Sequence, residues 1–350
     1  MPTRDAILDQ CARYPALRPQ DLLKFLHQST FGPGHLVADD AGGLDFLLAE
    51  HAKAADTRGV EPLDGDYVRA HLGLLDAGLS PAALWRCFRL SSLRPAGTAA
   101  DLEGRLAVAL SLAQEGLLPF SHEAFSAALS AWRSQGFPAM RHSPAFRDAY
   151  APAYRVLHKD YAWMLPLLTA MDVKTAEGRP LLVAIDGGAG SGKSTLAGEL
   201  QRIYDCPVFH MDDFFLRPHQ RTPERLDTPG GNVDHERFLS EVLLPWSRGE
   251  TVRYRRWDCH AQAFCPTAEL PPAPLAIVEG SYSCHPALRE HYGLTVFLSV
   301  SPALQRRRIE GRNAPEVRQR FFDLWIPLEQ RYFEAFNIPG HCDLTLEVQP

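Results

Sequence analysis

The chain of 350 residues predicts an α/β domain with a doubly wound, parallel, five-stranded sheet, preceded by an all-helical domain. Three observations support this prediction. The second half holds five short apolar runs separated by helical stretches, and a glycine-rich loop joins the first run to a helix. The first half shows apolar residues at helical spacing and no alternating strand pattern. Because the chain is long for a single core, we expect two domains.

Residues 1–172 are expected to form a helical accessory domain. Apolar residues recur at three- and four-residue spacing in residues 21–26 and again in residues 102–112. Ser80 and Ser143 each precede a proline, which is typical of an N-cap followed by the first helical position. Both therefore predict helix starts.

Residues 173–180, with several charges, Gly178 and Pro180, predict a linker into a second domain over 181–350. The apolar runs beyond the linker are continuous, which indicates strands buried on both faces of a parallel sheet. The predicted strands are Leu181–Asp186, Pro207–Met211, Leu275–Glu279, Leu294–Val300 and Asp343–Val348. The proline-rich stretch 266–274 is expected to be a surface connection.

Composition excludes several classes of protein. With 45% hydrophobic residues, 22% charged residues and a net charge of −6, the chain is typical of a globular protein without the basic patch of a nucleic-acid binder. The N-terminal residues lack a signal pattern, and no apolar run approaches a membrane span. We expect a cytoplasmic protein with a small-molecule partner, without nucleic acid or membrane, and we leave open whether it forms a homo-oligomer.

The seven cysteines are scattered, which favours reduced thiols over a disulfide framework. One group could in principle hold zinc, but its adjacent Cys-His pairs lack the usual ligand spacing, so ordinary thiols are favoured. Its members are Cys259, His260, Cys265, Cys284 and His285.

The glycine-rich loop matches G-x-x-x-x-G-K-[ST] directly after the first predicted strand and before a helix. Its backbone N–H groups and the helix N-terminus can surround the phosphates of a nucleotide such as ATP. Lys193 would reach the β- and γ-phosphates, and Ser194 would ligate Mg²⁺. The predicted nucleotide-binding residues of the loop are Gly187, Gly188, Ala189, Gly190, Ser191, Gly192, Lys193, Ser194 and Thr195.

Carboxylates follow two further predicted strands, where ligands of open α/β sheets bind. Asp212 and Asp213 follow the second strand, and Glu279 ends the third. Transfer of a phosphoryl group to a hydroxyl needs a proton acceptor and Mg²⁺, so Asp212 is the candidate base and Glu279 a candidate near the metal or the acceptor. A helix N-cap is the alternative role for one aspartate of the pair.

Arginines follow the predicted helix start at Ser301, and two of them, Arg308 and Arg312, share a helix face. We interpret this face as a lid that closes over the phosphates. The alternative is a solvated basic helix whose arginines pair with Glu310 and Glu316.

Residues 180–350 resemble the superfamily of uridine kinases, nicotinamide riboside kinases and phosphoribulokinases. The resemblance includes the loop 187–195, the segment 210–215 with its Asp-Asp-Phe-Phe sequence, Val278-Glu279-Gly280, the arginines from Arg306, and Trp325-Ile326-Pro327. It implies ATP and Mg²⁺ as cofactors and Asp212 and Lys193 as catalytic residues, with Glu279 near metal or substrate. It further implies Ser194, Asp212 and Glu279 near the metal, and Arg308 and Arg312 near the nucleotide.

The acceptor side of this resemblance is thinner. Asn232-Val233-Asp234-His235 is similar to the family segment whose aspartate contacts the acceptor sugar, and Val252-Arg253-Tyr254 is similar to the stretch beside the nucleoside base. Asp213, Asp234 and Tyr254 are therefore the candidate substrate-binding residues. Residues 255–260 depart from the uridine kinase pattern.

The N-terminal half carries two segments of interest. Residues 28–35 predict a helix end with glycine caps, with ligand contact by His35 as the alternative. Residues 142–155 combine His142 and Arg147 with aromatic side chains. Core packing is favoured there over a contribution to an acceptor pocket.

We thus expect an ATP- and Mg²⁺-dependent kinase of a small metabolite hydroxyl, with a nucleoside-like acceptor preferred. Two alternatives stay open: a kinase of a non-nucleoside small molecule, and a regulatory or scaffold protein that binds ATP through a kinase-like domain.

Overall fold

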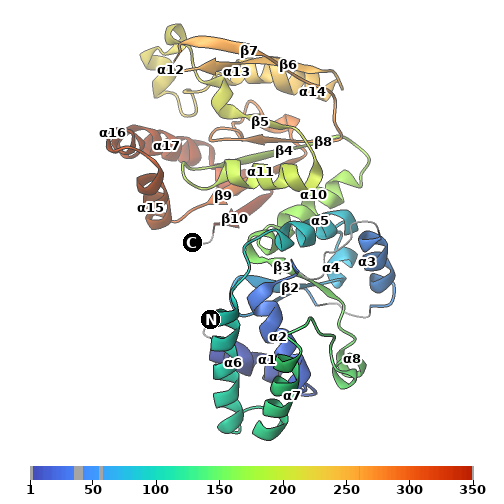
Figure 1. The fold of residues 1–350 in the computed structure, drawn as a ribbon. Helices are drawn as coiled ribbons and strands as arrows, with labels where there is room; N and C mark the ends of the chain where they lie inside the picture. The colour runs from blue at the N-terminus through green and yellow to red at the C-terminus, as the bar shows by residue number, and fades with distance from the viewer. Residues whose placement is uncertain (1–2, 35–41, 55–57, 260, 349–350) are drawn as a thin grey trace. The chain divides into compact units, whose positions relative to one another are not determined.

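The structure, a computed structural model, describes residues 3–34, 42–54, 58–259 and 261–348. The chain divides into two compact units, Met1–Asp172 and Val173–Pro350, which are described separately (Figure 1). Helix α10 (Leu165–Thr175) crosses this boundary. The first residues of the expected linker 173–180 are therefore helical, and β4 begins at Leu181.

Helices make up most of the first unit. Ser80 and Ser143 are N-caps, and their hydroxyls accept hydrogen bonds from the backbone N–H groups of Ala83 and Phe146. Both predicted helix starts are confirmed. The helices are α1 (Thr3–Arg13), α2 (Pro19–Phe31), α3 (Gly43–His51), α4 (Gly73–Asp76), α5 (Pro81–Ser92), α6 (Ala99–Gln114), α7 (His122–Ser134), α8 (Pro144–Tyr150) and α9 (Lys159–Ala162).

The prediction that this unit is all-helical is wrong. It contains an antiparallel sheet of order β1-β2-β3, formed by β1 (Val60–Pro62), β2 (Tyr67–His71) and β3 (Tyr154–His158). The central strand β2 is buried along its whole length, although it carries Arg69 and His71. Its charged residues point into the unit and pair there, so the apolar alternation that would reveal a strand is missing.

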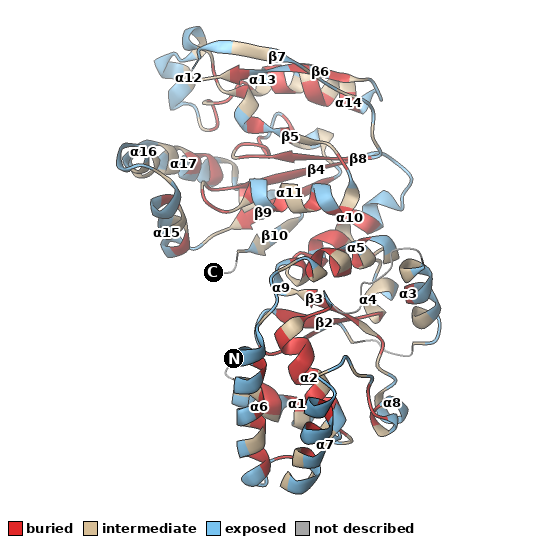
Figure 2. Cartoon of the chain, viewed as in Figure 1, coloured by how far each residue is buried: buried red, intermediate tan, exposed pale blue. Residues whose placement is uncertain are grey.

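The second unit has the predicted parallel sheet of five strands, in the order β10-β9-β4-β8-β5. The strands correspond to the five predicted apolar runs, and all four pairings are parallel. Figure 2 shows the central strands as buried, which explains their continuous apolar character. The strands are β4 (Leu181–Gly187), β5 (Val208–His210), β8 (Leu275–Glu279), β9 (Leu294–Ser299) and β10 (Leu344–Glu347).

Helix α11 (Lys193–Tyr204) follows the glycine-rich loop and packs against β4, β5 and β8. The other helical elements are η2 (Met211–Phe214), η3 (Pro218–Gln220), α12 (Pro223–Asp227), α13 (His235–Phe238), η4 (Leu239–Leu243), α14 (Leu244–Ser247), η5 (Arg289–His291), α15 (Pro302–Arg312), α16 (Pro315–Arg320), η6 (Phe321–Trp325), α17 (Ile326–Phe336) and α18 (Ile338–His341).

An antiparallel hairpin, β6 (Val252–Asp258) with β7 (Ala263–Leu270), completes this unit. Part of the stretch 266–274, expected to be a connection, is therefore strand. A two-stranded ribbon has an open edge on each strand, so β7 accommodates Pro266 without losing a pairing that it needs.

No helix within the described part of the chain is long and apolar enough to cross a membrane.

Candidate active site

The glycine-rich loop takes the conformation that its sequence predicts, between β4 and α11. Gly187 has a φ of +148°, and a Cβ at this position would lie 2.6 Å from the carbonyl oxygen of Leu298. Gly192 is the N-cap of α11, with a φ of +98°. These positions require glycine, and the resulting turn presents backbone N–H groups at the N-terminal end of a helix.

Lys193 lies along the loop. Its Nζ donates hydrogen bonds to the carbonyl oxygens of Gly187, at 2.7 Å, and Gly188, at 3.0 Å. The ammonium group is thus held against the loop by these two carbonyl oxygens, where it can contact the phosphates of a nucleotide.

Ser194 and Glu279 meet at the C-terminal edge of the sheet. The Ser194 hydroxyl donates to Glu279 Oε2 at 3.1 Å, and His210 Nδ1 lies 2.6 Å from Glu279 Oε1. The hydrogen bond to Glu279 raises the pKa of His210. This bond thus favours the protonated form of His210 over the neutral form beside the buried Glu279 carboxylate.

Asp212 belongs to the short helix η2 directly after β5, and it does not cap that helix. Its side chain stays accessible, but the protein around the carboxylate removes enough water to raise its pKa, and the charge of Glu279 raises it further. The charge of Lys193 acts in the opposite direction. Asp212 lies two residues after His210, and Lys193 lies directly before Ser194. Because His210 and Ser194 both contact Glu279, the three charged side chains lie around one site.

The oxygen atoms of Ser194, Asp212 and Glu279 fit a Mg²⁺ ion, which prefers hard oxygen ligands and keeps several waters. Among the described residues no group of three His, Cys, Asp or Glu side chains could hold a metal by itself. Mg²⁺ in a phosphate-transfer site needs no such group, since it is bound by one or two carboxylates together with phosphate oxygens.

Asp213 and Tyr254, two of the predicted substrate residues, contact each other. The Tyr254 hydroxyl donates to Asp213 Oδ2 at 3.2 Å, and its ring stacks on Phe214 with a centroid distance of 5.2 Å. Arg237 donates to the backbone carbonyl of Asp213 at 2.9 Å and lies over the Phe214 ring. The pairing brings β6 next to the segment that carries Asp212.

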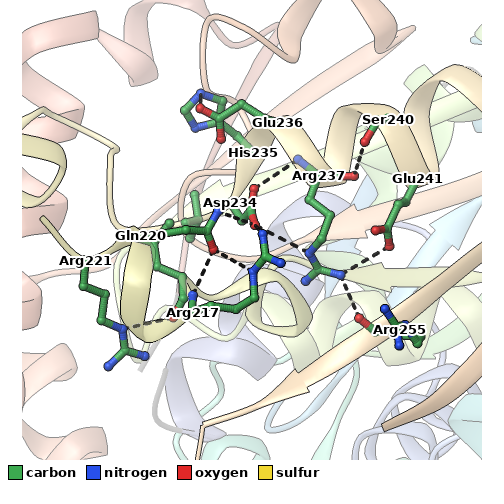
Figure 3. A network of polar contacts seen from close by, with 12 residues as sticks. Arg217, Gln220, Arg221, Asp234, His235, Glu236, Arg237, Ser240, Glu241 and Arg255 are labelled. Carbon is green, nitrogen blue, oxygen red and sulfur yellow. Dashed lines mark hydrogen bonds and ion pairs between the residues drawn. The ribbon is translucent and has the colours of Figure 1, made fainter. Parts of the chain in front are cut away.

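Asp234, the third predicted substrate residue, is buried in a polar network (Figure 3). Its Oδ1 accepts from the backbone N–H of Arg237 and caps α13, while Oδ2 accepts from Gln220 Nε2 at 2.8 Å. Arg217 approaches Oδ2 at 3.5 Å. These residues line a hollow of about 630 Å³, so Asp234 sits at its wall with its oxygens already bonded to protein donors.

The two predicted lid arginines differ in position on α15. Arg308 donates to the carbonyl oxygens of Gly190, at 3.2 Å, and Ser191, at 3.3 Å. Arg312 is exposed at the end of the helix. Arg306 pairs with Glu310, as the solvated-helix alternative expects. Only Arg308 of the two predicted lid arginines makes hydrogen bonds to the loop.

Sequence reasoning missed Glu329 on α17. Its Oε2 accepts from the backbone N–H of Ala189 at 2.8 Å, and its Oε1 accepts from the Ser281 hydroxyl at 2.7 Å. Burial raises the pKa of Glu329. One turn later on α17, the Tyr332 hydroxyl donates to Asp186, at the base of the loop, at 2.9 Å. Helix α17 therefore contacts the phosphate-binding loop, which no local motif indicates.

The other candidates of the sequence analysis have simpler roles. All seven cysteines are free, while His260 lies outside the described residues. Helix α2 ends at Phe31 with Gly32 as its C-cap, as predicted, and His35 lies outside the described residues. His142 stacks on Phe146 with ring centroids 4.2 Å apart, in agreement with core packing.

Comparisons with known proteins found sequence relatives and solved structures that resemble about half of this chain. No protein-family model matches the chain. A uridine kinase from Clostridium perfringens is 25% identical over an alignment of 196 residues, which covers 49% of this chain and 93% of the relative. A uridine kinase from Clostridium tetani is also 25% identical, over 198 residues, covering 49% of this chain and 92% of the relative.

A solved structure of a possible uridine kinase from Bacillus stearothermophilus aligns with a TM-score of 0.38 and 18% identity, covering 51% of this chain and 99% of the other. The sequence relatives match about half of the chain, as the resemblance predicted for the C-terminal half. The resemblance of this half to uridine kinases is confirmed.

Proposed function

We propose that the chain is an ATP- and Mg²⁺-dependent kinase that phosphorylates a hydroxyl group of a small metabolite, with a nucleoside as the preferred acceptor. The observation that carries this proposal is the convergence of Asp212, Lys193 and Glu279 beside the phosphate-binding loop, where Glu279 contacts both Ser194 and His210. A protein that only binds ATP as a switch does not need an accessible carboxylate of raised pKa at this position.

The residues divide the chemistry as follows. Asp212 orients the acceptor hydroxyl and takes its proton as the new bond forms, which suits an aspartate whose pKa is raised. Lys193 and the loop N–H groups bind the phosphates, and Arg308 adds positive charge at the loop. Ser194, Asp212 and Glu279 would hold Mg²⁺, which when bound neutralises charge that develops on the phosphate oxygens.

Two features favour a nucleoside acceptor. The sequence relatives, which match about half of this chain, are uridine kinases. Tyr254 is in addition an aromatic side chain bonded to Asp213, two residue types that can stack on a base and bind a sugar hydroxyl. A non-nucleoside acceptor stays the alternative, because the chain departs from the uridine kinase sequence just after Tyr254.

The test is an assay of ADP release with purified full-length protein, ATP and Mg²⁺, across uridine, cytidine, nicotinamide riboside, pantothenate and simple sugars. We expect the fastest turnover with a nucleoside. Replacing Asp212 with Asn should lower kcat by about a hundredfold or more and leave ATP binding in place.

Asp205→Asn is a matched control, because Asp205 is exposed at the end of α11 in a left-handed conformation that Asn also adopts. This variant should turn over like the wild type. Full activity of Asp212→Asn, or ATP binding without turnover of any acceptor, would contradict the proposal.

A further inference from the structure

The first unit contains a cavity of about 720 Å³, a volume typical of small-molecule sites. Helices α2, α3 and α5 and the segment 141–156 line it, so the cavity is built entirely from the first unit. Nothing in the proposed kinase chemistry uses it.

The floor of the cavity is polar and belongs to a buried network. His142 Nδ1 lies 3.0 Å from Asp21 Oδ1, and the Tyr154 hydroxyl lies 2.6 Å from His142 Nε2 and 3.3 Å from Gln28 Oε1. Arg69 donates to Gln28 Oε1 at 3.0 Å. Because these bonds satisfy the interior groups, His142, Tyr154 and Gln28 are held in place where they face the cavity.

The network continues below the cavity, where Arg69 donates to Glu61 at 3.0 Å and Glu61 also bonds His71. Such a chain of buried charges adds little to stability compared with apolar packing. The hydrogen bonds of this network instead fix the orientation of the polar side chains that line the cavity, as a binding site requires.

The charged groups of the cavity wall are mostly positive. Among the residues that the structure describes, Glu50 is the only acid that lines it, and it is paired with Arg155 at 2.6 Å. Within the described residues, the guanidinium groups of Arg141 and Arg147 make no hydrogen bond or ion pair. Lys24 donates to the carbonyl of Met140, and burial lowers its pKa to about 8. The unbalanced charge therefore favours an anion.

Another part of the lining is aromatic. Trp85 and Phe88 pack with ring centroids 5.4 Å apart, and Phe46 leaves 67% of its surface exposed at the cavity. Gly43 allows the Trp85 ring to lie against the start of α3, because a Cβ at this position would be 2.1 Å from the ring. A flat apolar group could stack here.

We propose that this cavity binds a small molecule that joins a planar apolar ring to an anionic group, either carboxylate or phosphate. Arg141, Arg147 and Lys24 would bind the anion through charge-assisted hydrogen bonds, and Phe46, Trp85 and Phe88 would cover the ring. The proposal does not depend on the kinase activity of the second unit.

The test is calorimetric titration of the full-length protein with 1-naphthoate and with 1-naphthyl phosphate, under saturating Mg²⁺-ADP so that the phosphate-binding loop is filled. We expect at least one probe to bind, and the stronger of the two identifies the anion. Neutral 1-naphthol and inorganic phosphate should each bind about tenfold more weakly or not at all.

A double variant with Arg141→Ala and Arg147→Ala should weaken binding of the preferred probe by about tenfold or more. Phe46→Ala, at another wall, should weaken it independently. All three side chains are exposed, so these variants should fold like the wild type. Arg86→Ala is the matched control, since Arg86 is exposed on α5 and does not line the cavity. Failure of both probes to bind, or equal binding by the double variant, would overturn the proposal.

Discussion

Glu329 and a bound nucleotide would compete for the same backbone donor of the phosphate-binding loop. The backbone N–H of Ala189 donates to the Glu329 carboxylate at 2.8 Å, while the loop N–H groups are the donors that a nucleotide phosphate uses. A bound phosphate that takes this donor must first displace a carboxylate that is itself negatively charged. We therefore expect Glu329→Gln to bind ATP more tightly than the wild type.

The size of the effect follows from the type of bond that is lost. A hydrogen bond to a charged acceptor contributes about 1.5–3 kcal/mol and one to a neutral acceptor about 0.5–1.5 kcal/mol, so the substitution makes the donor easier to release by about 1 kcal/mol. This corresponds to about a fivefold lower Kd for ATP. The fold should tolerate the change. The Ser281 hydroxyl, which is the second donor to Glu329, can also donate to the carbonyl oxygen of Gly187 at 3.0 Å, so it keeps a partner in the variant.

The assay is calorimetric titration of ATP in the presence of Mg²⁺ and without acceptor. Glu334→Gln is the matched control, since Glu334 is exposed on the same helix, and its Kd should equal that of the wild type. Unchanged or weaker binding of ATP by a well-folded Glu329→Gln variant would refute the reasoning, because the carboxylate would then support the nucleotide-binding conformation.

Three further predictions concern other parts of the molecule. Burial and the charge of Glu279 raise the pKa of Asp212, and a base must be ionised to act. A pH profile of kcat/KM should therefore fall on the acidic side at a pH above the ordinary aspartate pKa of about 4, and a limb at or below that pH would count against Asp212. Arg308→Ala should lower kcat by about a hundredfold with a smaller change in ATP affinity, and an unaltered kcat would exclude Arg308 from the transition state. Arg69→Met removes the buried guanidinium that pairs with Glu61 and leaves this carboxylate only its hydrogen bonds to His71 and Tyr14 among the described residues, so it should lower the free energy of unfolding of the first unit by about 3 kcal/mol in a urea titration; a loss below about 1 kcal/mol would show that the pair is dispensable.

The parallel sheet was predictable from the sequence because its strands obey a simple physical rule. Strands covered on both faces need apolar side chains throughout, so runs such as Leu181–Asp186 mark them directly. The phosphate-binding loop was predictable because only glycine fits positions such as Gly187, where a Cβ would meet the Leu298 carbonyl.

The strands of the first unit did not follow that rule. The strands at residues 60–62 and 67–71 are short. They also carry Glu61, Arg69 and His71, which are buried although residues of these types are expected at the surface. Glu61 pairs with both Arg69 and His71 across the β1–β2 strands, and Gln28 on α2 accepts hydrogen bonds from Arg69, so only the folded structure reveals why burial is tolerated.

The candidate site divides in the same way. Lys193, Asp212 and Glu279 could be predicted because each lies at or beyond the carboxyl end of a strand, at the edge where open α/β sheets bind their ligands. Glu329 could not, because its contact with Ala189 spans 140 residues and depends on the direction in which α17 meets the loop. Sequence motifs thus identify site residues that lie at the ends of the strands. Site residues that come from helices packed against the loop can be identified only from the structure. This difference directs the search for acceptor-binding residues toward the helices and the β6–β7 hairpin, where Arg237 already joins Asp213 to the network around Asp234.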